Sequence, residues 1–351
     1  MEYRTLGRTG LKVSLIGLGT MTWGQQNTEA EGHEQMDYAL DQGVNLFDAA
    51  ELYSIPPKAE TQGSTERIIG SWLKARKNRD KIVLASKVCG RNDFTWFRDD
   101  GSKCRLTKGQ ITEALHKSLA RLGTDYLDLY QLHAPNRVMP WGSNPTRFID
   151  AEFAVNADDD NFYEVLETLD GFVKAGKIRH IGLSNESAWG TMKFLFESEK
   201  SGLPRVATIQ NAYNLVNRTY DTALAELSIR EGVNLLAYSP LGQGFLTGKY
   251  LDGALPPGSR TTLFNRGQRY QRPGVDDAVR DYMAIAKEAG MDAATLAIAF
   301  VNSRSFVASN LIGATTMEQL KIAIATKDVK LSADVLDKID AVHQLRGNPA
   351  P

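Results

Sequence analysis

The sequence predicts an α/β protein built as an eight-stranded (β/α)8 TIM barrel, and three features agree on this. Nearly continuous apolar runs alternate with amphipathic helical segments along the whole chain. Apolar runs without a polar face are typical of parallel strands that are covered on both sides. Eight such alternations fit a closed barrel, a fold that commonly takes about 250 residues or more in one domain. We therefore expect residues 1–351 to form a single domain.

The elements follow one another in a regular order. The predicted strands are 14–20, 44–49, 81–88, 125–133, 178–185, 206–214, 233–240 and 309–315. The predicted helices are 31–42, 64–76, 111–123, 161–175, 187–201, 217–231, 275–289, 292–303, 316–326 and 332–345. In the third helix Ile111, Leu115 and Leu119 share one face, and Gly123 is a typical stop signal. The first ten residues contain Gly7 and predict a small β-hairpin that caps the bottom of the barrel.

Three connections are too long to be simple turns. They are 89–106, 134–160 and 241–274, and each follows the carboxyl end of a predicted strand. Barrel enzymes keep their active sites at that end of the barrel. The alternative is an open, doubly wound sheet, but the segment GLGTMTWG at 17–24 lacks the third glycine of the dinucleotide-binding fingerprint.

Composition and charge narrow the class of protein. The chain has 41 Lys and Arg against 42 Asp and Glu, a net charge of −1, which favours neither nucleic acid nor an anionic membrane surface. It has no apolar run of membrane-spanning length and no histidine spacing typical of metal ligands. Its two cysteines, Cys89 and Cys104, form no C-x-x-C pair and no disulfide framework. We expect a cytoplasmic protein, in which Cys89 is either a buried inert thiol or an oxidation-sensitive one.

Four polar residues follow the second, third and fourth predicted strands. Asp48, Lys87 and His133 end successive strands, and Tyr53 lies shortly beyond Asp48. The pKa of a tyrosine side chain is about 10. A lysine ammonium beside the tyrosine lowers that pKa, and an aspartate keeps the lysine charged. The histidine can donate a hydrogen bond to a substrate oxygen as negative charge develops there. This set suits the protonation of an alkoxide formed when a carbonyl is reduced.

A series of segments in this order resembles the aldo-keto reductase superfamily along nearly the whole chain. They are GLGTMTWG, NLFDAAELY, ASKV, YLDLYQLH, GKIRHIGLSN, YSPLGQGFLTGKY and LIGATTMEQL. The resemblance is greatest to the bacterial Tas-like branch, which is related to the potassium-channel β-subunits. It implies NADPH-dependent reduction of aldehydes or ketones to alcohols, by hydride transfer from nicotinamide C4. It also implies a catalytic tetrad of Asp48, Tyr53, Lys87 and His133, with Tyr53 as the general acid.

The resemblance also implies which residues hold NADPH/NADP+ across the barrel mouth. The expected contacts are Gly19, Thr20, Met21, Asp48, Ser184, Asn185, Gln210, Tyr238, Ser239, Pro240, Leu241, Gly242, Lys249, Arg260, Gly313, Thr315 and Gln319. Related proteins carry a Glu-Asn pair that contacts adenine, where this chain has Ile322 and Ala323. That departure predicts a weaker or rebuilt contact with adenine.

Aromatic residues in the strand-end loops predict an apolar substrate pocket. Its expected members are Trp23, Tyr53, Trp96, His133 and Trp141. These loops hold no cluster of Lys or Arg, so we expect small neutral carbonyl compounds as substrates. The sequence leaves open whether the chain forms a homo-oligomer.

Two other functions compete with the reductase. The first is a regulatory protein that binds NADPH with negligible turnover, as the relation to the channel β-subunits suggests. The second is a barrel aldolase or isomerase in which Lys87 forms a Schiff base. That chemistry needs a lysine with a lowered pKa, which the neighbouring Asp48 opposes.

Overall fold

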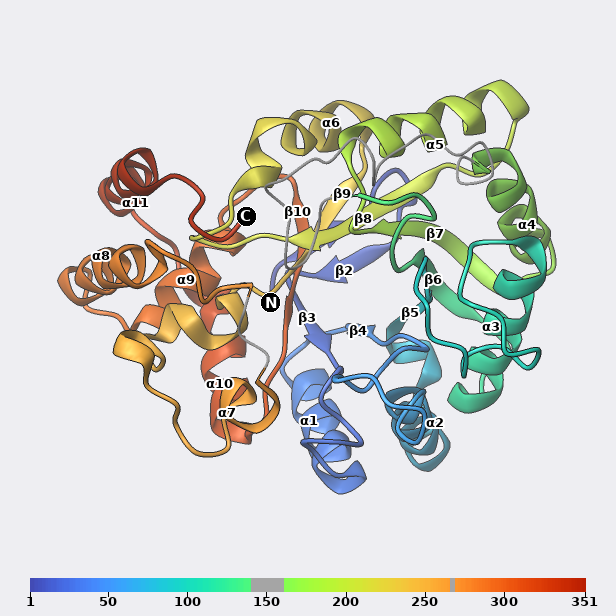
Figure 1. Ribbon diagram of the computed structural model, residues 1–351, viewed down its shortest axis with the longest axis horizontal. Helices are drawn as coiled ribbons and strands as arrows, with labels where there is room; N and C mark the ends of the chain where they lie inside the picture. The colour runs from blue at the N-terminus through green and yellow to red at the C-terminus, as the bar shows by residue number, and fades with distance from the viewer. Residues whose placement is uncertain (140–160, 266–268) are drawn as a thin grey trace.

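Eight parallel strands close into a barrel, which confirms the predicted fold class. The computed structural model describes residues 1–139, 161–265 and 269–351. The strands are β3 (Ile16–Gly19), β4 (Leu46–Asp48), β5 (Val83–Val88), β6 (Leu127–Leu132), β7 (Ile178–Ser184), β8 (Val206–Ala212), β9 (Asn234–Tyr238) and β10 (Val307–Ile312). Neighbours in sequence pair in parallel, and β10 pairs with β3 to close the ring. Figure 1 shows this ring with helices packed around it.

Helices follow the strands around the outside of the barrel. They are α1 (Glu29–Asp41), α2 (Ser64–Arg76), α3 (Lys108–Leu122), α4 (Phe162–Lys174), α5 (Ala188–Ser201), α6 (Leu224–Glu231), α7 (Arg260–Phe264), α8 (Val275–Glu288), α9 (Ala293–Asn302), α10 (Met317–Ala325) and α11 (Ala333–Arg346). Short 3-10 helices are η1 (Arg79–Lys81), η3 (Thr219–Thr222), η4 (Gly242–Thr247), η5 (Leu251–Gly253) and η6 (Thr326–Asp328). Within the described ranges, none of the helices is long and apolar enough to span a bilayer.

Local sequence explains where several helices begin and end. Thr28 and Glu31 form a capping box that starts α1. Gly123 ends α3 in the left-handed conformation, as predicted. The predicted helix at 217–231 is divided into η3 and α6, and the long connection after β9 contains the short helix α7, which its polar, glycine-rich sequence did not indicate.

The predicted hairpin at the amino terminus is confirmed. Strands β1 (Tyr3–Thr5) and β2 (Lys12–Ser14) pair antiparallel. Leu6 and Val13 from this hairpin are fully buried in a cluster with residues of the barrel strands. The hairpin therefore supplies apolar side chains to the floor of the barrel.

Two layers of side chains fill the barrel, and their order positions the site. The lower layer is apolar and consists of Leu6, Val13, Leu46, Val83, Ala85, Leu129, Leu236, Ala308 and Leu311. Successive residues of a strand alternate between its faces, so residues two apart point the same way. Asp48 follows Leu46 by this step, and Lys87 follows Ala85. The inward positions therefore change from apolar to polar at the carboxyl ends of the strands.

Candidate active site

A buried ion pair joins β4 to β5 at the barrel mouth. The Lys87 Nζ donates to Asp48 Oδ2 at 2.6 Å and to the Ala49 carbonyl oxygen at 2.8 Å. The side chain of Lys87 is fully buried and that of Asp48 nearly so. Because the pair is shielded from water, each charge is held by its partner and by fixed hydrogen bonds.

Tyr53 and His133 complete the group that the sequence predicted. Lys87 Nζ donates to the Tyr53 hydroxyl oxygen at 3.3 Å. The rings of Tyr53 and His133 meet edge to face, with centroids 5.6 Å apart. Tyr53 keeps 9% of its surface exposed, and His133 is partly exposed at the end of β6. The structure thus brings all four residues together, with two rings facing outward and the ion pair behind them.

The protonation states follow from burial and charge. Burial raises the pKa of Tyr53, and this outweighs the opposite effect of the Lys87 ammonium. Lys87 does lower that pKa, as expected, but burial of the phenol has the larger effect on it. Burial, followed by the charge of Lys87, moves the pKa of His133 well below 6.5. At neutral pH Tyr53 is a protonated phenol and His133 a neutral imidazole.

Lys87 remains charged. Burial by itself would lower its pKa, but the Asp48 carboxylate and the Tyr53 hydroxyl together raise it above the ordinary value. A Schiff-base lysine must lose its proton to act as a nucleophile. The geometry therefore gives no support to the aldolase or isomerase alternative.

Two glutamines hold the other oxygen of Asp48. Gln131 and Gln210 donate to Asp48 Oδ1 at 2.9 and 3.0 Å, and Gln210 also donates to Gln131 Oε1 at 3.1 Å. Gln131 was not among the predicted site residues. Its signal was present, because it lies two residues before His133 on β6 and so faces the same way.

The residues expected at the nicotinamide lie at the ends of β7, β8 and β9. Asn185, in the left-handed conformation with φ of 52°, donates to the His133 carbonyl oxygen at 2.8 Å and accepts from the Tyr238 hydroxyl at 2.7 Å. Ser184 Oγ donates to the Gln210 carbonyl oxygen at 2.9 Å. These contacts connect the tetrad to the strand ends across the mouth.

The opposite rim is formed by the end of β3. Thr20 Oγ1 donates to the Asp48 carbonyl oxygen at 2.9 Å. A side chain at Gly19 would place its Cβ only 3.1 Å from the Ile312 carbonyl oxygen. Met21 Sδ lies 3.9 Å from Arg260 Nη1, so the connection after β9 reaches back to β3.

The turn after β9 has an unusual run of left-handed residues. Ser239 (φ 57°), Gly242 (54°), Gln243 (56°) and Gly244 (96°) belong to it, and Pro240 and Leu241 lie between them. Within this turn the backbone N–H groups of Gly242 and Gly244 donate to the Ser239 and Leu241 carbonyl oxygens, each at 2.9 Å. Lys249 is exposed a few residues further on.

Arg269 is a second residue that the sequence did not single out. Its Nη1 donates to the Tyr238 hydroxyl at 3.1 Å, while its Nε is buried and, in the described part of the chain, without a hydrogen-bond partner. Nothing in the local sequence distinguishes it from Arg272, because its position depends on the fold of the long connection.

The segment expected at the adenosine lies at the start of α10. Thr315 donates from its N–H and its Oγ1 to Gln319 Oε1 at 3.0 and 3.1 Å. Gly313 is exposed just before this turn. Ile322 is 41% exposed and Ala323 is buried, so neither offers a polar group to an adenine.

The aromatic residues expected in the pocket lie in different surroundings. Trp23 is fully buried, and its Nε1 donates to Gln35 Oε1 at 3.0 Å. We therefore remove Trp23 from the expected pocket, because its indole packs in the core. Trp96 is 39% exposed and lies against Phe94, with ring centroids 4.4 Å apart. Trp141 lies outside the described residues.

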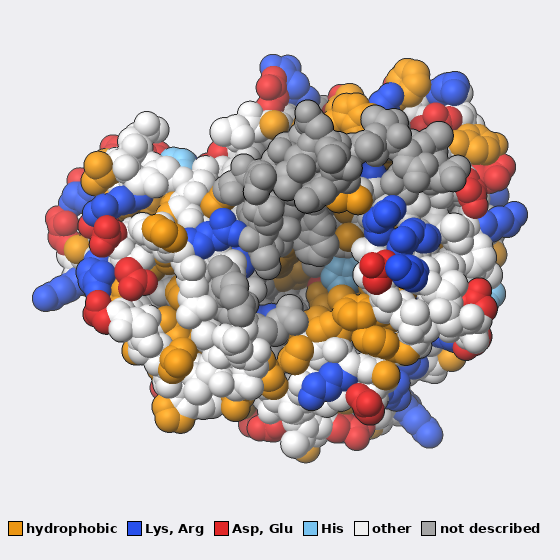
Figure 2. Space-filling model, viewed as in Figure 1, with side chains coloured by type: hydrophobic (Ala, Val, Ile, Leu, Met, Phe, Trp, Pro, Cys, Tyr) orange, Lys and Arg blue, Asp and Glu red, His pale blue; other side chains and the backbone are white. Residues whose placement is uncertain are grey.

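The space-filling view shows the mouth of the barrel from outside. Figure 2 shows a hollow near the centre of this face, with hydrophobic side chains gathered along its lower right margin. This surface is consistent with an apolar substrate. Among the described residues, no cluster of His, Cys, Asp and Glu could hold a metal ion.

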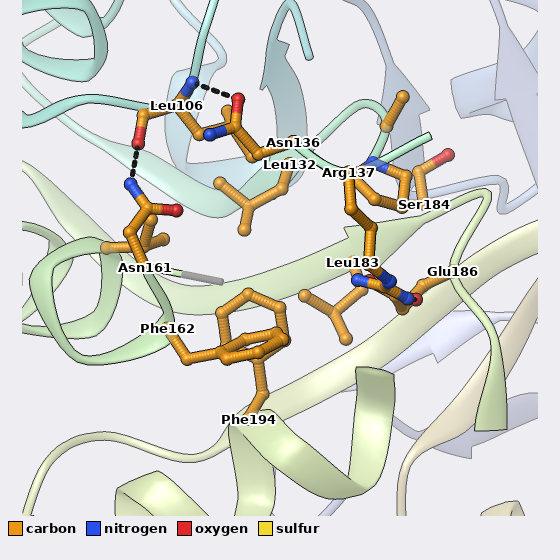
Figure 3. A pocket seen from close by; sticks show the side chains of 13 residues that line it. Leu106, Leu132, Asn136, Arg137, Asn161, Phe162, Leu183, Ser184, Glu186 and Phe194 are labelled. Atoms are coloured by element: carbon orange, nitrogen blue, oxygen red, sulfur yellow. Dashed lines mark hydrogen bonds and ion pairs between the residues drawn. The ribbon is translucent and has the colours of Figure 1, made fainter. Parts of the chain in front are cut away.

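A cleft lined by the carboxyl ends of β6 and β7 and by helices α4 and α5 includes Ser184 among its lining residues (Figure 3). Phe162 and Phe194 meet edge to face at its floor, and Arg137 pairs with Glu186 at its side. Asn161 Nδ2 donates to the Leu106 carbonyl oxygen at 2.7 Å. The cleft contains none of the four tetrad residues, and we assign it no part in catalysis.

Comparisons with known proteins agree with this geometry. The model of the aldo/keto reductase family matches residues 15–344. The chain is 50% identical to Protein tas of Escherichia coli K12 over the full length of both chains. It is 32% identical to the uncharacterized oxidoreductase YrpG of Bacillus subtilis, over 100% of this chain and 98% of that one. It is also 31% identical to a probable voltage-gated potassium channel subunit beta of Arabidopsis thaliana, over 98% and 97%. The chain therefore belongs to the aldo/keto reductase family of oxidoreductases.

Proposed function

We propose that this protein uses NADPH to reduce small neutral aldehydes or ketones to alcohols, with Tyr53 as the proton donor. The observation that carries the proposal is the contact chain from Asp48 through Lys87 to Tyr53, with His133 against the Tyr53 ring. A phenol, a charged lysine and a neutral imidazole converge at one point of the mouth.

The residues around the mouth fit a nicotinamide dinucleotide. Ser184, Asn185 and Gln210 would hold the carboxamide, and Tyr238 would lie against the ring. The turn at 239–242, with Lys249 and Arg260, would hold the phosphates, and Gly313, Thr315 and Gln319 the adenosine end. The buried Nε of Arg269, which has no hydrogen-bond partner among the described residues, adds a cationic donor beside Tyr238. When bound, NADPH supplies the hydride that reduces the carbonyl carbon.

Residues of the chain then supply the proton that the substrate oxygen receives and stabilise the phenolate left behind. The phenol of Tyr53 donates to the carbonyl oxygen as negative charge develops on it. Lys87 stays protonated and donates toward the phenol oxygen, which stabilises the phenolate that forms. The neutral His133 donates a hydrogen bond to the same substrate oxygen, and Asp48 fixes Lys87 in place.

Binding and turnover test this function together. Purified protein would be titrated with NADPH and NADH by fluorescence, and then assayed at 340 nm with 4-nitrobenzaldehyde and methylglyoxal. We expect tighter binding of NADPH than NADH, and carbonyl-dependent oxidation of NADPH. Absence of NADPH binding would contradict the cofactor assignment, and binding without turnover on any carbonyl compound would contradict the reductase.

The relation to proteins named as potassium channel β-subunits supports a second candidate. In that case the protein binds NADPH, oxidises it at a negligible rate and regulates a partner protein. The intact tetrad favours the reductase. A partner captured only in the presence of NADPH, together with absent reductase activity, would favour the regulatory function.

A further inference from the structure

The two cysteines of the chain meet in space, although they are far apart in the sequence. Cys89 follows the end of β5, and Cys104 lies near the end of the connection that leads to α3. Both are buried, and they pack in one small cluster with Phe97. Leu52, the residue before Tyr53, packs against the same cluster.

The backbone around the cysteines is fixed by several contacts. Asn92 and Cys104 form an antiparallel bridge, and Asn92 Nδ2 donates to Cys89 Sγ at 2.8 Å. The backbone N–H of Cys89 donates to Glu51 Oε1 at 2.6 Å. Glu51 in turn accepts two hydrogen bonds from Arg98, at 2.9 and 2.8 Å, and both side chains of this pair are fully buried. Both ends of the loop 90–103 are thus held against the turn that carries Tyr53.

The surroundings make the two thiols unequal. The hydrogen bond with Cys89, together with the charge of Arg98, lowers the pKa of the Cys104 thiol against the opposing effect of burial. The same contact and burial raise the pKa of the Cys89 thiol. The two thiols therefore differ in acidity, and both are almost fully buried, with 3% of Cys89 and none of Cys104 exposed.

We propose that Cys89 and Cys104 are a redox-active dithiol that closes to a disulfide at the base of the loop 90–103. With a hydroperoxide as oxidant, the thiolate of one cysteine attacks one peroxide oxygen and becomes a sulfenic acid, and the O–O bond breaks to release hydroxide or an alkoxide. The sulfur of the second cysteine then attacks the sulfur of the first, the S–O bond breaks, and the proton of the second thiol leaves with the hydroxyl as water. The two thiols lose two electrons in total, and the peroxide gains them.

The cross-link acts on the proposed active site through two positions. Cys89 lies two residues beyond Lys87 on the same strand end, and the loop carries Trp96, which is exposed next to Phe94. Closing the disulfide fixes this loop covalently, so the fit of a bulky carbonyl compound against Trp96 changes. This second part rests on the proposed function, whereas formation of the disulfide does not.

Mass spectrometry tests the disulfide directly. The full-length protein would be treated with hydrogen peroxide in its native state, then denatured and alkylated with iodoacetamide. A free-cysteine standard in the same tube shows when oxidation is complete. We expect wild-type protein to lose the mass of two hydrogens, to take up no alkyl group and to recover both thiols with dithiothreitol. The chain has only two cysteines, so an intramolecular disulfide can join only this pair.

Control variants and the opposite outcomes keep the test decisive. Cys89→Ser and Cys104→Ser each leave one cysteine and are expected to form no intramolecular disulfide. Two alkylated thiols after complete oxidation of the standard, irreversible oxidation of either cysteine, or only disulfide-linked dimers would each overturn the proposal.

An activity assay separates the disulfide from its effect. We expect oxidation to change the KM for 4-nitrobenzaldehyde at least severalfold in wild-type protein but not in Cys104→Ser. A disulfide that leaves KM unchanged would overturn the effect on the pocket. Absence of carbonyl reduction in both redox states would instead count against the proposed function, while the mass result would still support the disulfide.

Discussion

The floor and the mouth of the barrel are built from the same strands but differ in every property that matters for function. At the floor, Leu46, Ala85 and Leu129 pack in an apolar cluster of buried side chains. Two residues further along the same strands, Asp48, Lys87 and Gln131 form a connected network of charges and hydrogen bonds. The apolar layer keeps water away from one side of the polar layer, where electrostatic interactions are therefore stronger.

Side chains only two residues apart on one strand therefore have different roles: the inner ones stabilise the fold and the outer ones belong to the candidate active site. Substitutions at the floor should change the free energy of unfolding with little effect on turnover by the folded protein. Substitutions at the mouth should change turnover, pH dependence or both. Five experiments test this distinction, and the first four are given in order of decreasing expected effect.

Tyr53→Phe should have the largest effect. Removing the proton donor is expected to lower turnover by about 10³-fold, because a positioned general acid contributes roughly that much, while NADPH affinity changes only a few-fold. Turnover is measured at 340 nm and affinity by fluorescence titration. Tyr130→Phe is the matched control, since it removes a buried hydroxyl that has no hydrogen-bond partner among the described residues. Loss of NADPH binding with turnover per bound NADPH retained would contradict the role of Tyr53.

Asp48→Asn should destabilise the fold and abolish most of the activity. It leaves the buried Lys87 ammonium without its counter-charge, which costs about 3–5 kcal/mol. Urea denaturation measures this loss. The double variant Asp48→Asn, Lys87→Met removes the unpaired ammonium of Lys87. It should recover part of the stability but none of the turnover. If Asp48→Asn were as stable as wild type, the ion pair between Asp48 and Lys87 would not contribute to the stability of the fold.

Leu129→Ala tests the floor. Leu129 is fully buried in the lower layer, and truncation of such a leucine costs about 2–4 kcal/mol because it leaves a cavity. Urea denaturation should show that loss, whereas kcat at a temperature where the variant is folded should stay within about twofold, a change worth well under 1 kcal/mol of barrier. A large fall in kcat would mean that the two layers are coupled through packing.

The pH dependence of stability should show the smallest effect. The pKa of His133 is lowered in the fold by burial and by Lys87, so below pH 6.5 the unfolded chain binds a proton that the folded chain does not. Stability is therefore present above that pH and is lost as the pH falls toward the folded-state pKa, by up to about 1.4 kcal/mol for each pH unit. Urea denaturation at pH 6.5 and 5.5 should show a smaller loss for His133→Gln than for wild type. Equal losses would contradict a buried neutral His133.

The activity profile complements that measurement. Burial raises the pKa of Tyr53 above 10.0, so the phenol keeps its proton throughout the neutral range. Reduction should be independent of pH there and should decline only under strongly alkaline conditions. A decline centred near neutral pH would assign the proton to another group.

Local patterns in the sequence account for the barrel strands, the hairpin and the grouping of Asp48, Lys87 and His133. Continuous apolar runs and their spacing are properties of neighbouring residues, and a parallel barrel places every strand end at the same mouth. The ends of the elements differed by a few residues, and the helix α7 was missed, because capping and loop contacts decide these features.

Only the tertiary structure decided which residues lie against one another. It buried Trp23 in the core, brought Gln131 to Asp48 and Arg269 to Tyr238, and placed the free thiols of Cys89 and Cys104 in one cluster. It also set the net direction of the shift in the Tyr53 pKa, because desolvation depends on everything packed around the phenol. Residues distant in sequence make these contacts, and no local pattern encodes their distance or their burial.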